Sequence, residues 1–132
     1  MTAASRQLLH IAAHADTIEA RILPALKAGR TVVLDRFWWS TFVYGSVDGI
    51  DRRILETIIQ VEMAIWRSCR PYIAFLIDRA VPFRQECSKE RFDALRNEYT
   101  VIAATAAKEH SVVKFENHKS PEITVRHMLA AT

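Results

Sequence analysis

Apolar residues recur at three- and four-residue spacing in two long segments, a pattern typical of helices with one buried face. The first segment covers residues 5–28, and Gly29 is well placed to end its helix. The second begins at Asp51, a suitable N-cap, and continues to about Cys69, before Pro71. The predicted buried positions are Leu8, Ile11, Ala15, Ile18, Ile22 and Leu26 in the first helix and Ile54, Ile58, Val61 and Ile65 in the second.

Three short runs are apolar without alternation, which is typical of strands buried on both faces. They cover residues 31–34, 72–77 and 111–115. We expect a loop at residues 45–49 and a charged helical region from Pro82 to about Lys108. Pro121 at a first helical position predicts a final helix. Each strand is followed by a polar pair: Asp35-Arg36, Asp78-Arg79 and Glu116-Asn117.

This alternation of helices and strands predicts a single α/β domain over residues 1–132, with a parallel sheet and right-handed crossovers. Ligands of such sheets bind beyond the carboxyl ends of the strands. The three polar pairs are therefore the first candidates for a site.

Composition supports a globular domain, because 50% of the residues are apolar and 25% are charged. A disordered chain is excluded. The longest uncharged stretch, residues 37–47, is eleven residues long, well short of the roughly 20 that span a bilayer. No basic-then-apolar secretory signal opens the sequence. Cys69 and Cys87 lack the spacing of a metal or redox motif, so we expect reduced thiols and a cytoplasmic location.

The net charge is only +3, but seven basic residues and four acidic ones lie between Arg67 and Arg96. A solvated helix face is the ordinary explanation, and an anionic ligand such as phosphate is the alternative. No nucleic-acid-binding motif accompanies these arginines, so a nucleic-acid partner is not expected.

The pair Asp35-Arg36 has the chemistry of a phosphate site. An aspartate can hold a hydrated magnesium ion or polarise a hydroxyl, and an arginine can bind phosphate through two parallel hydrogen bonds. A salt-bridged strand end is the structural alternative. Ser40, Thr41 and Tyr44 follow on or near the first turns of a helix, where capping and packing are equally ordinary roles.

Residues 23–44 resemble the thymidylate kinase family, in which a helix leads into Pro-Ala-Leu, a glycine, a buried strand and Asp-Arg-Phe or Asp-Arg-Tyr, with serine and tyrosine following. The resemblance continues over nearly the whole chain. Further matching segments are residues 71–78, the run Arg91-Phe92 through Arg96 and Tyr99, and residues 112–117 with Ser120-Pro121-Glu122.

The resemblance implies a three-layer fold of the P-loop nucleotide kinases, with helices on both faces of a parallel sheet. It implies phosphoryl transfer from ATP, with Mg²⁺, to dTMP or a related deoxynucleoside monophosphate. Arg36 would hold the acceptor phosphate and Asp35 would serve the magnesium. Ser40 and Thr41 would touch the acceptor nucleotide, and Tyr44 would lie beside its deoxyribose.

The same resemblance assigns the closing lid to Arg84 and Arg91, with Arg79 as a third candidate. It assigns Asn117 to the adenine side, and it implies a homodimer packed through helices. Large apolar surfaces on the two predicted long helices agree with such an interface.

Two local departures from the family pattern concern the acceptor side. Gly45 replaces a polar residue, usually glutamine. His10 and His14 fall where the family places the phenylalanine and arginine that contact thymine. From the residues alone, this pair is a partly exposed helix pair, a base contact or, least expected, a metal site.

A third departure concerns ATP. The glycines are Gly29, Gly45 and Gly49, and none precedes a Lys-Ser or Lys-Thr pair. No loop of backbone amides can therefore cradle the ATP phosphates in the usual way. We expect an N-terminally truncated kinase that lacks the P-loop strand and is inactive alone. The alternative is a non-catalytic remnant of the fold that binds nucleotide or dimerises.

Overall fold

The computed structural model describes residues 1–82, 88–108, 111–117 and 120–132. The chain divides into two compact units, Met1–Arg70 and Pro71–Thr132. Each unit has its own secondary structure, and each contains part of the predicted site.

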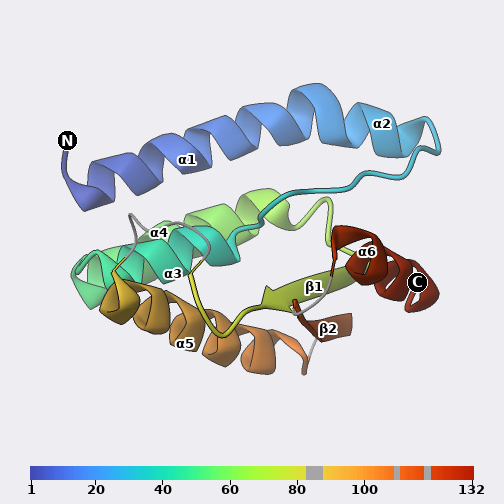
Figure 1. The fold of residues 1–132 in the computed structure, drawn as a ribbon. Coiled ribbons are helices and arrows are strands. Elements are labelled where there is room, and N and C mark those ends of the chain that lie inside the picture. The colour runs from blue at the N-terminus through green and yellow to red at the C-terminus, as the bar shows by residue number, and fades with distance from the viewer. Residues whose placement is uncertain (83–87, 109–110, 118–119) are drawn as a thin grey trace. The chain divides into compact units, whose positions relative to one another are not determined.

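The N-terminal unit begins with one nearly continuous helical stretch (Figure 1). It consists of α1 (Ala3–Thr17), the π-helical turn η1 (Ile18–Ile22) and α2 (Leu23–Lys27). The wider π turn comes just before Pro24, which has no N–H and whose ring crowds the preceding turn. Gly29 has a φ of +70° directly after the helix ends. The predicted helix over residues 5–28 and its terminating glycine are confirmed.

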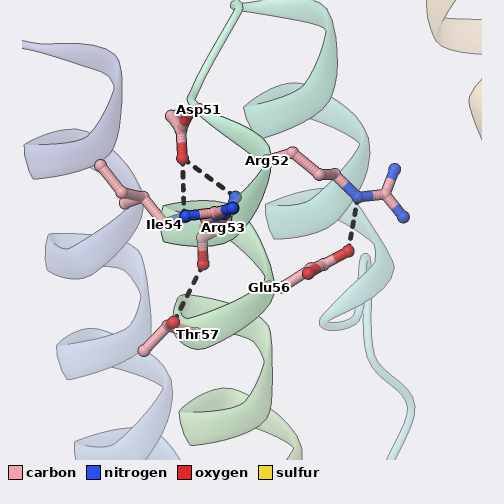
Figure 2. A network of polar contacts seen from close by, with 6 residues as sticks. All are labelled: Asp51, Arg52, Arg53, Ile54, Glu56 and Thr57. Carbon is pink, nitrogen blue, oxygen red and sulfur yellow. Dashed lines mark hydrogen bonds and ion pairs between the residues drawn. The ribbon is translucent and has the colours of Figure 1, made fainter.

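Two further helices, α3 (Trp39–Val47) and α4 (Arg52–Trp66), complete this unit. Figure 2 shows how α4 begins: the carboxylate of Asp51 accepts hydrogen bonds from the backbone N–H groups of Arg53 and Ile54, at 3.0 and 3.3 Å. The predicted N-cap at Asp51 is therefore confirmed. The predicted loop at residues 45–49 is partly wrong, because residues 45–47 form the last turn of α3.

The core of the unit contains Ile18 and Ile22 from the first helical stretch and Trp66 from α4. The buried face of α4 is Leu55, Ile58, Ile59, Glu62 and Trp66. The predicted stripe is half right: Ile58 is buried and Ile65 packs against the core, but Ile54 and Val61 are about half exposed. Helix α4 carries apolar residues on two faces, and the face with the large Trp66 ring is the one that is buried.

Residues 31–34 do not form the predicted strand. They belong to an irregular connection between α2 and α3, in which Val33 is 90% exposed. The backbone groups of a strand need a neighbouring strand to bond with. Among the described residues of the N-terminal unit there is no strand that could supply those bonds.

The C-terminal unit contains β1 (Ile73–Asp78), α5 (Lys89–Ala106), β2 (Ser111–Glu116) and α6 (Pro121–Ala130). The two strands are parallel, with Ile73 opposite Ser111 and Asp78 opposite Glu116. Helix α5 contacts both strands, so the unit has the βαβ arrangement expected from the sequence (Figure 1). The order of these four elements and the approximate bounds of both strands and α6 are confirmed, but α5 begins at Lys89 and not at the predicted Pro82, which lies outside any helix.

The predicted parallel pairing is thus confirmed for two strands, and a three-layer sheet remains an expectation. Among the described residues, no helix is both long and apolar enough to cross a membrane.

Gly45 offers a test of the packing between α3 and α4. A Cβ at this position would lie 2.5 Å from Cδ1 of Leu55, which is only 1% exposed, and 3.3 Å from Cδ1 of Ile50. Helix propensity alone predicts that Gly45→Ala stabilises the protein by about 1 kcal/mol. We expect the opposite sign, a loss of about 1 kcal/mol, because overpacking a core costs about 1–3 kcal/mol. Urea unfolding measures the difference.

Ser46→Ala, one position along the same helix, is the matched control and should not destabilise the protein. A Gly45→Ala variant as stable as Ser46→Ala would show that Leu55 moves aside without cost.

Candidate functional site

Arg36 has an unusual backbone conformation. It is the one non-glycine residue in the described part of the chain with a positive φ, +79°. L-residues with side chains avoid this left-handed region at a cost of about 1–2 kcal/mol. Such conformations cluster at functional sites, where the surrounding structure holds them in place.

The side chain of Arg36 contacts Tyr44 on α3. Its guanidinium lies over the tyrosine ring, 5.4 Å from the ring centroid, and its Nη1 donates a hydrogen bond to the tyrosine hydroxyl at 3.2 Å. Arg36 is exposed and Tyr44 is half-buried. The two predicted site residues are therefore brought together, with an arginine head group presented at the start of α3.

The other residues predicted around Arg36 differ in exposure. Asp35 is exposed, Ser40 is half-buried in the first turn of α3, and Thr41 is only 2% exposed. The Thr41 hydroxyl is buried and has no hydrogen-bond partner among the described atoms. Their roles toward an acceptor nucleotide remain predictions.

The two histidines of α1 have different surroundings. His14 Nδ1 lies 2.6 Å from Oε1 of Glu62, a carboxylate on α4 that is fully buried. The indole N–H of Trp66 donates to the same oxygen at 3.4 Å. A carboxylate oxygen can only accept, so we assign Nδ1 as the donor, and Glu62 fixes the orientation of the imidazole. His10 is exposed.

One aromatic ring contacts this polar pair, and a second ring packs against the first. Trp66 meets His14 edge-on with ring centroids 5.8 Å apart, and Phe37 meets Trp66 edge-on at 4.9 Å. Phe37 directly follows Arg36 in the chain. Oε2 of Glu62 has no hydrogen-bond partner within the described residues, although most buried side-chain polar atoms have at least one partner.

A second buried carboxylate organises the C-terminal unit. Asp78, at the end of β1, accepts hydrogen bonds from Nε and Nη2 of Arg96 at 2.6 and 2.8 Å. Nζ of Lys114 on β2 lies 2.9 Å from its Oδ2. The hydrogen bonds from Arg96 hold the pKa of the Asp78 carboxyl well below its usual range, with Lys114 adding to the effect and burial opposing it.

Asn117 lies at the same edge of the sheet, because its backbone N–H donates to the backbone oxygen of Asp78 at 2.7 Å. The carboxyl ends of β1 and β2 thus meet as predicted. Arg79 is half-buried beside them and Arg91 is exposed in the first turn of α5, while Arg84 lies outside the described residues. The lid assignment of Arg79, Arg84 and Arg91 remains a prediction.

Sequence reasoning did not identify the two carboxylate centres as such. Glu62 lies at helical spacing from Leu55, Ile59 and Trp66. A single acid within this apolar series was the one sequence feature that indicated a buried carboxylate. Asp78 was singled out only as a strand end. Its partners Arg96 and Lys114 come from different elements, so no local spacing points to them.

Comparison with known proteins supports one family. The sequence model of a family described as thymidylate kinase matches residues 1–114. A thymidylate kinase of Chromohalobacter salexigens is 32% identical over 121 residues, covering 80% of this chain and 56% of that protein. The thymidylate kinase of Chlamydia trachomatis serovar D is 38% identical over 78 residues, covering 59% of this chain and 37% of that protein. The chain thus spans about half or less of these relatives' lengths.

The Asp78 centre makes the stability of the C-terminal unit depend on pH. A carboxyl whose folded-state pKa is lowered stabilises the fold above its unfolded pKa of about 4, and this contribution is lost as the pH falls below that value. We expect the free energy of unfolding to decrease between pH 5 and 2, and Asp78→Asn to flatten that decrease while destabilising the protein at pH 7. Hydrogen exchange of the β1 and β2 amides measures both effects.

Asp93→Asn is the matched control, because Asp93 is a more exposed carboxylate paired with Lys89 in the same unit. An equally steep pH dependence in Asp78→Asn and the unsubstituted chain would contradict the assignment.

Proposed function

Because the chain belongs to the thymidylate kinase family, we propose that it provides the acceptor side of a nucleoside monophosphate kinase, with dTMP or a related deoxynucleotide as the phosphoryl acceptor. Arg36 is the residue that carries this proposal. By the family resemblance it matches the arginine that holds the acceptor phosphate, and from a strained backbone conformation its guanidinium lies over Tyr44 of α3.

A planar guanidinium suits this role. It offers paired N–H donors whose spacing matches two oxygens of a phosphate, and it remains charged at any physiological pH. Asp35 directly precedes it and is exposed. That carboxylate fits one ligand position of a hydrated Mg²⁺, an ion that usually takes one or two carboxylates together with phosphate oxygens. When bound, the ion would neutralise phosphate charge.

The triphosphate of ATP fits this chain less well. The 132 residues contain no glycine-rich loop ahead of Lys-Ser or Lys-Thr, so the backbone-amide cradle that kinases of this class use is not supplied by these residues. Catalysis, in this proposal, needs a phosphate-binding loop and its strand from further sequence or another chain.

The pair His14–Glu62 supports a base-side role in the same unit. The His14 ring meets Trp66 edge-on, and Phe37 packs against Trp66 in turn. A flat nucleobase is bound by such a combination of aromatic surface and directed hydrogen bonds. His10, one turn earlier, is the second proposed contact.

A homodimer is also part of the proposal. Large apolar side chains on α1 and α4 are about half exposed, and such surfaces are typical of interfaces. They are Leu8, Leu9, Ile54, Val61 and Met63.

Loss of the Arg36 guanidinium should weaken monophosphate binding. We expect Arg36→Ala to weaken dTMP binding by about 2 kcal/mol, roughly 30-fold, because a charge-assisted hydrogen-bond pair is removed. Arg36→Lys should restore only part, since the fork geometry is lost. Titration calorimetry measures the three dissociation constants. Arg30→Ala, in the same connection between α2 and α3, is the matched control. An equal loss of affinity in that variant would show that Arg36 contributes only its positive charge and no specific contact.

Turnover tests the catalytic part of the proposal. The purified chain should transfer no phosphate from ATP to dTMP. Fusing a strand and a glycine-rich phosphate-binding loop of the P-loop kinase class to its N-terminus should produce turnover, at about 1 per second or more for a restored kinase. The same fusion with its loop lysine replaced by alanine is the control. A correctly folded but inactive fusion would favour a non-catalytic nucleotide-binding role.

A further inference from the structure

We infer that Glu62 is a positioning residue for His14: it holds the Nδ1 side of the imidazole and makes Nε2 the nitrogen that meets the base of the nucleotide. The inference rests on the proposed function, because it takes His14 as a base contact. It goes beyond that function by assigning one ring nitrogen to the ligand and by giving Glu62 a role without a ligand contact of its own.

The pair is divided between the core and the surface. The side chain of Glu62 is 0% exposed, whereas that of His14 is 31% exposed. Nδ1 of His14 lies 2.6 Å from Oε1 of Glu62, and among the described residues Nε2 has no hydrogen-bond partner. The two nitrogens of an imidazole lie on opposite sides of the ring. A ring held by Nδ1 against the buried carboxylate therefore directs Nε2 away from that carboxylate.

The carboxylate itself is fixed by the core of the N-terminal unit. Glu62 lies on the buried face of α4, and the indole N–H of Trp66 donates to the same Oε1 at 3.4 Å. Trp66 belongs to the core cluster with Ile18 and Ile22, and its ring meets His14 edge-on. An acceptor held in this way orients the imidazole and keeps a proton on Nδ1, the arrangement by which a second group fixes the tautomer of a functional histidine.

Stability alone does not explain an acid at this position. The same buried face of α4 carries Leu55, Ile58 and Ile59, and well-packed apolar residues are often at least as stabilising as a buried ion pair. Oε2 of Glu62 also lacks a partner among the described residues, which adds a desolvation cost. An apolar residue could not select the tautomer of His14. A neutral imidazole carries its proton on either nitrogen, so Glu62 determines which nitrogen is offered to the ligand.

Nitrogen NMR of the 132-residue chain, labelled in its histidine rings, tests the assignment without any nucleotide. At alkaline pH, where the rings are neutral, we expect His14 to carry its proton on Nδ1. Glu62→Gln should preserve this signature, because its amide oxygen still accepts. In Glu62→Leu the ring signals of His14 should move toward those of the exposed His10. Glu56→Leu, which removes an exposed acid of the same helix, is the matched control and should leave His14 unchanged.

Titration calorimetry with dTMP and thymidine tests the role toward the ligand. We expect Glu62→Leu to weaken the binding of both ligands about fivefold to tenfold, the contribution of about one hydrogen bond, and Glu62→Gln to weaken it only about twofold. In a His14→Ala background, Glu62→Leu should cause no further loss of affinity. Far-UV circular dichroism confirms that each variant is folded.

The remaining outcomes separate this inference from the proposed function. A proton on Nε2 and not on Nδ1 of His14 in the neutral ring overturns the inference, whatever binds. An unchanged affinity in Glu62→Leu, or an equal loss with and without the His14 side chain, also overturns it, while Arg36 can still bind phosphate. If the unsubstituted chain binds neither dTMP nor thymidine, the proposed function fails and the base contact of His14 fails with it.

Discussion

A parallel strand is stable only where a neighbouring strand accepts and donates its backbone hydrogen bonds. This constraint explains why one unit contains strands and the other does not. In the C-terminal unit, β1 and β2 satisfy each other over six residue pairs, and α5 connects them across one face. The N-terminal unit is built without a strand among its described residues, so its backbone bonds lie almost entirely within helices. Its shape is set by the packing of helix faces around Ile18, Ile22 and Trp66.

Buried charge is handled in the same way in both units. A carboxylate removed from water costs several kcal/mol unless donors surround it. Asp78 is bonded to Arg96 of α5 and Lys114 of β2. Glu62 is bonded to His14 of α1 and to Trp66 of its own helix. Each acid therefore joins elements that are distant in sequence. The unpartnered Oε2 of Glu62 leaves its centre less completely satisfied than that of Asp78.

The sequence predicted most helices and two strands correctly for definite reasons. Caps and breakers act locally, so Asp51, Gly29 and Pro121 could be interpreted without knowing what surrounds them. Continuous apolar runs predicted β1 and β2. These predictions are correct because each strand has the other as its partner in the same unit. The run at residues 31–34 has the same composition, but whether it pairs depends on a neighbour, which no local pattern can show. The predicted stripe of α4 is only half right for a similar reason, since its apolar residues lie on two faces.

For the candidate site residues too, neighbours in the sequence predict some features, and others depend on contacts with residues farther along the chain. Asp-Arg at the end of an apolar run identified Arg36 from its immediate neighbours, but its positive φ and its contact with Tyr44 arise from how the chain enters α3. Residues 31–34 are held by no strand, so the connection can turn sharply just before the helix. The absence of pairing at 31–34 and the strained backbone at Arg36 are thus two consequences of one irregular connection. A strand pairing with residues 31–34 would fix the backbone immediately ahead of Arg36. With Arg36 as the proposed phosphate-binding residue, pairing of residues 31–34 with a neighbouring strand would be energetically coupled to the conformation of Arg36, and through it to phosphate.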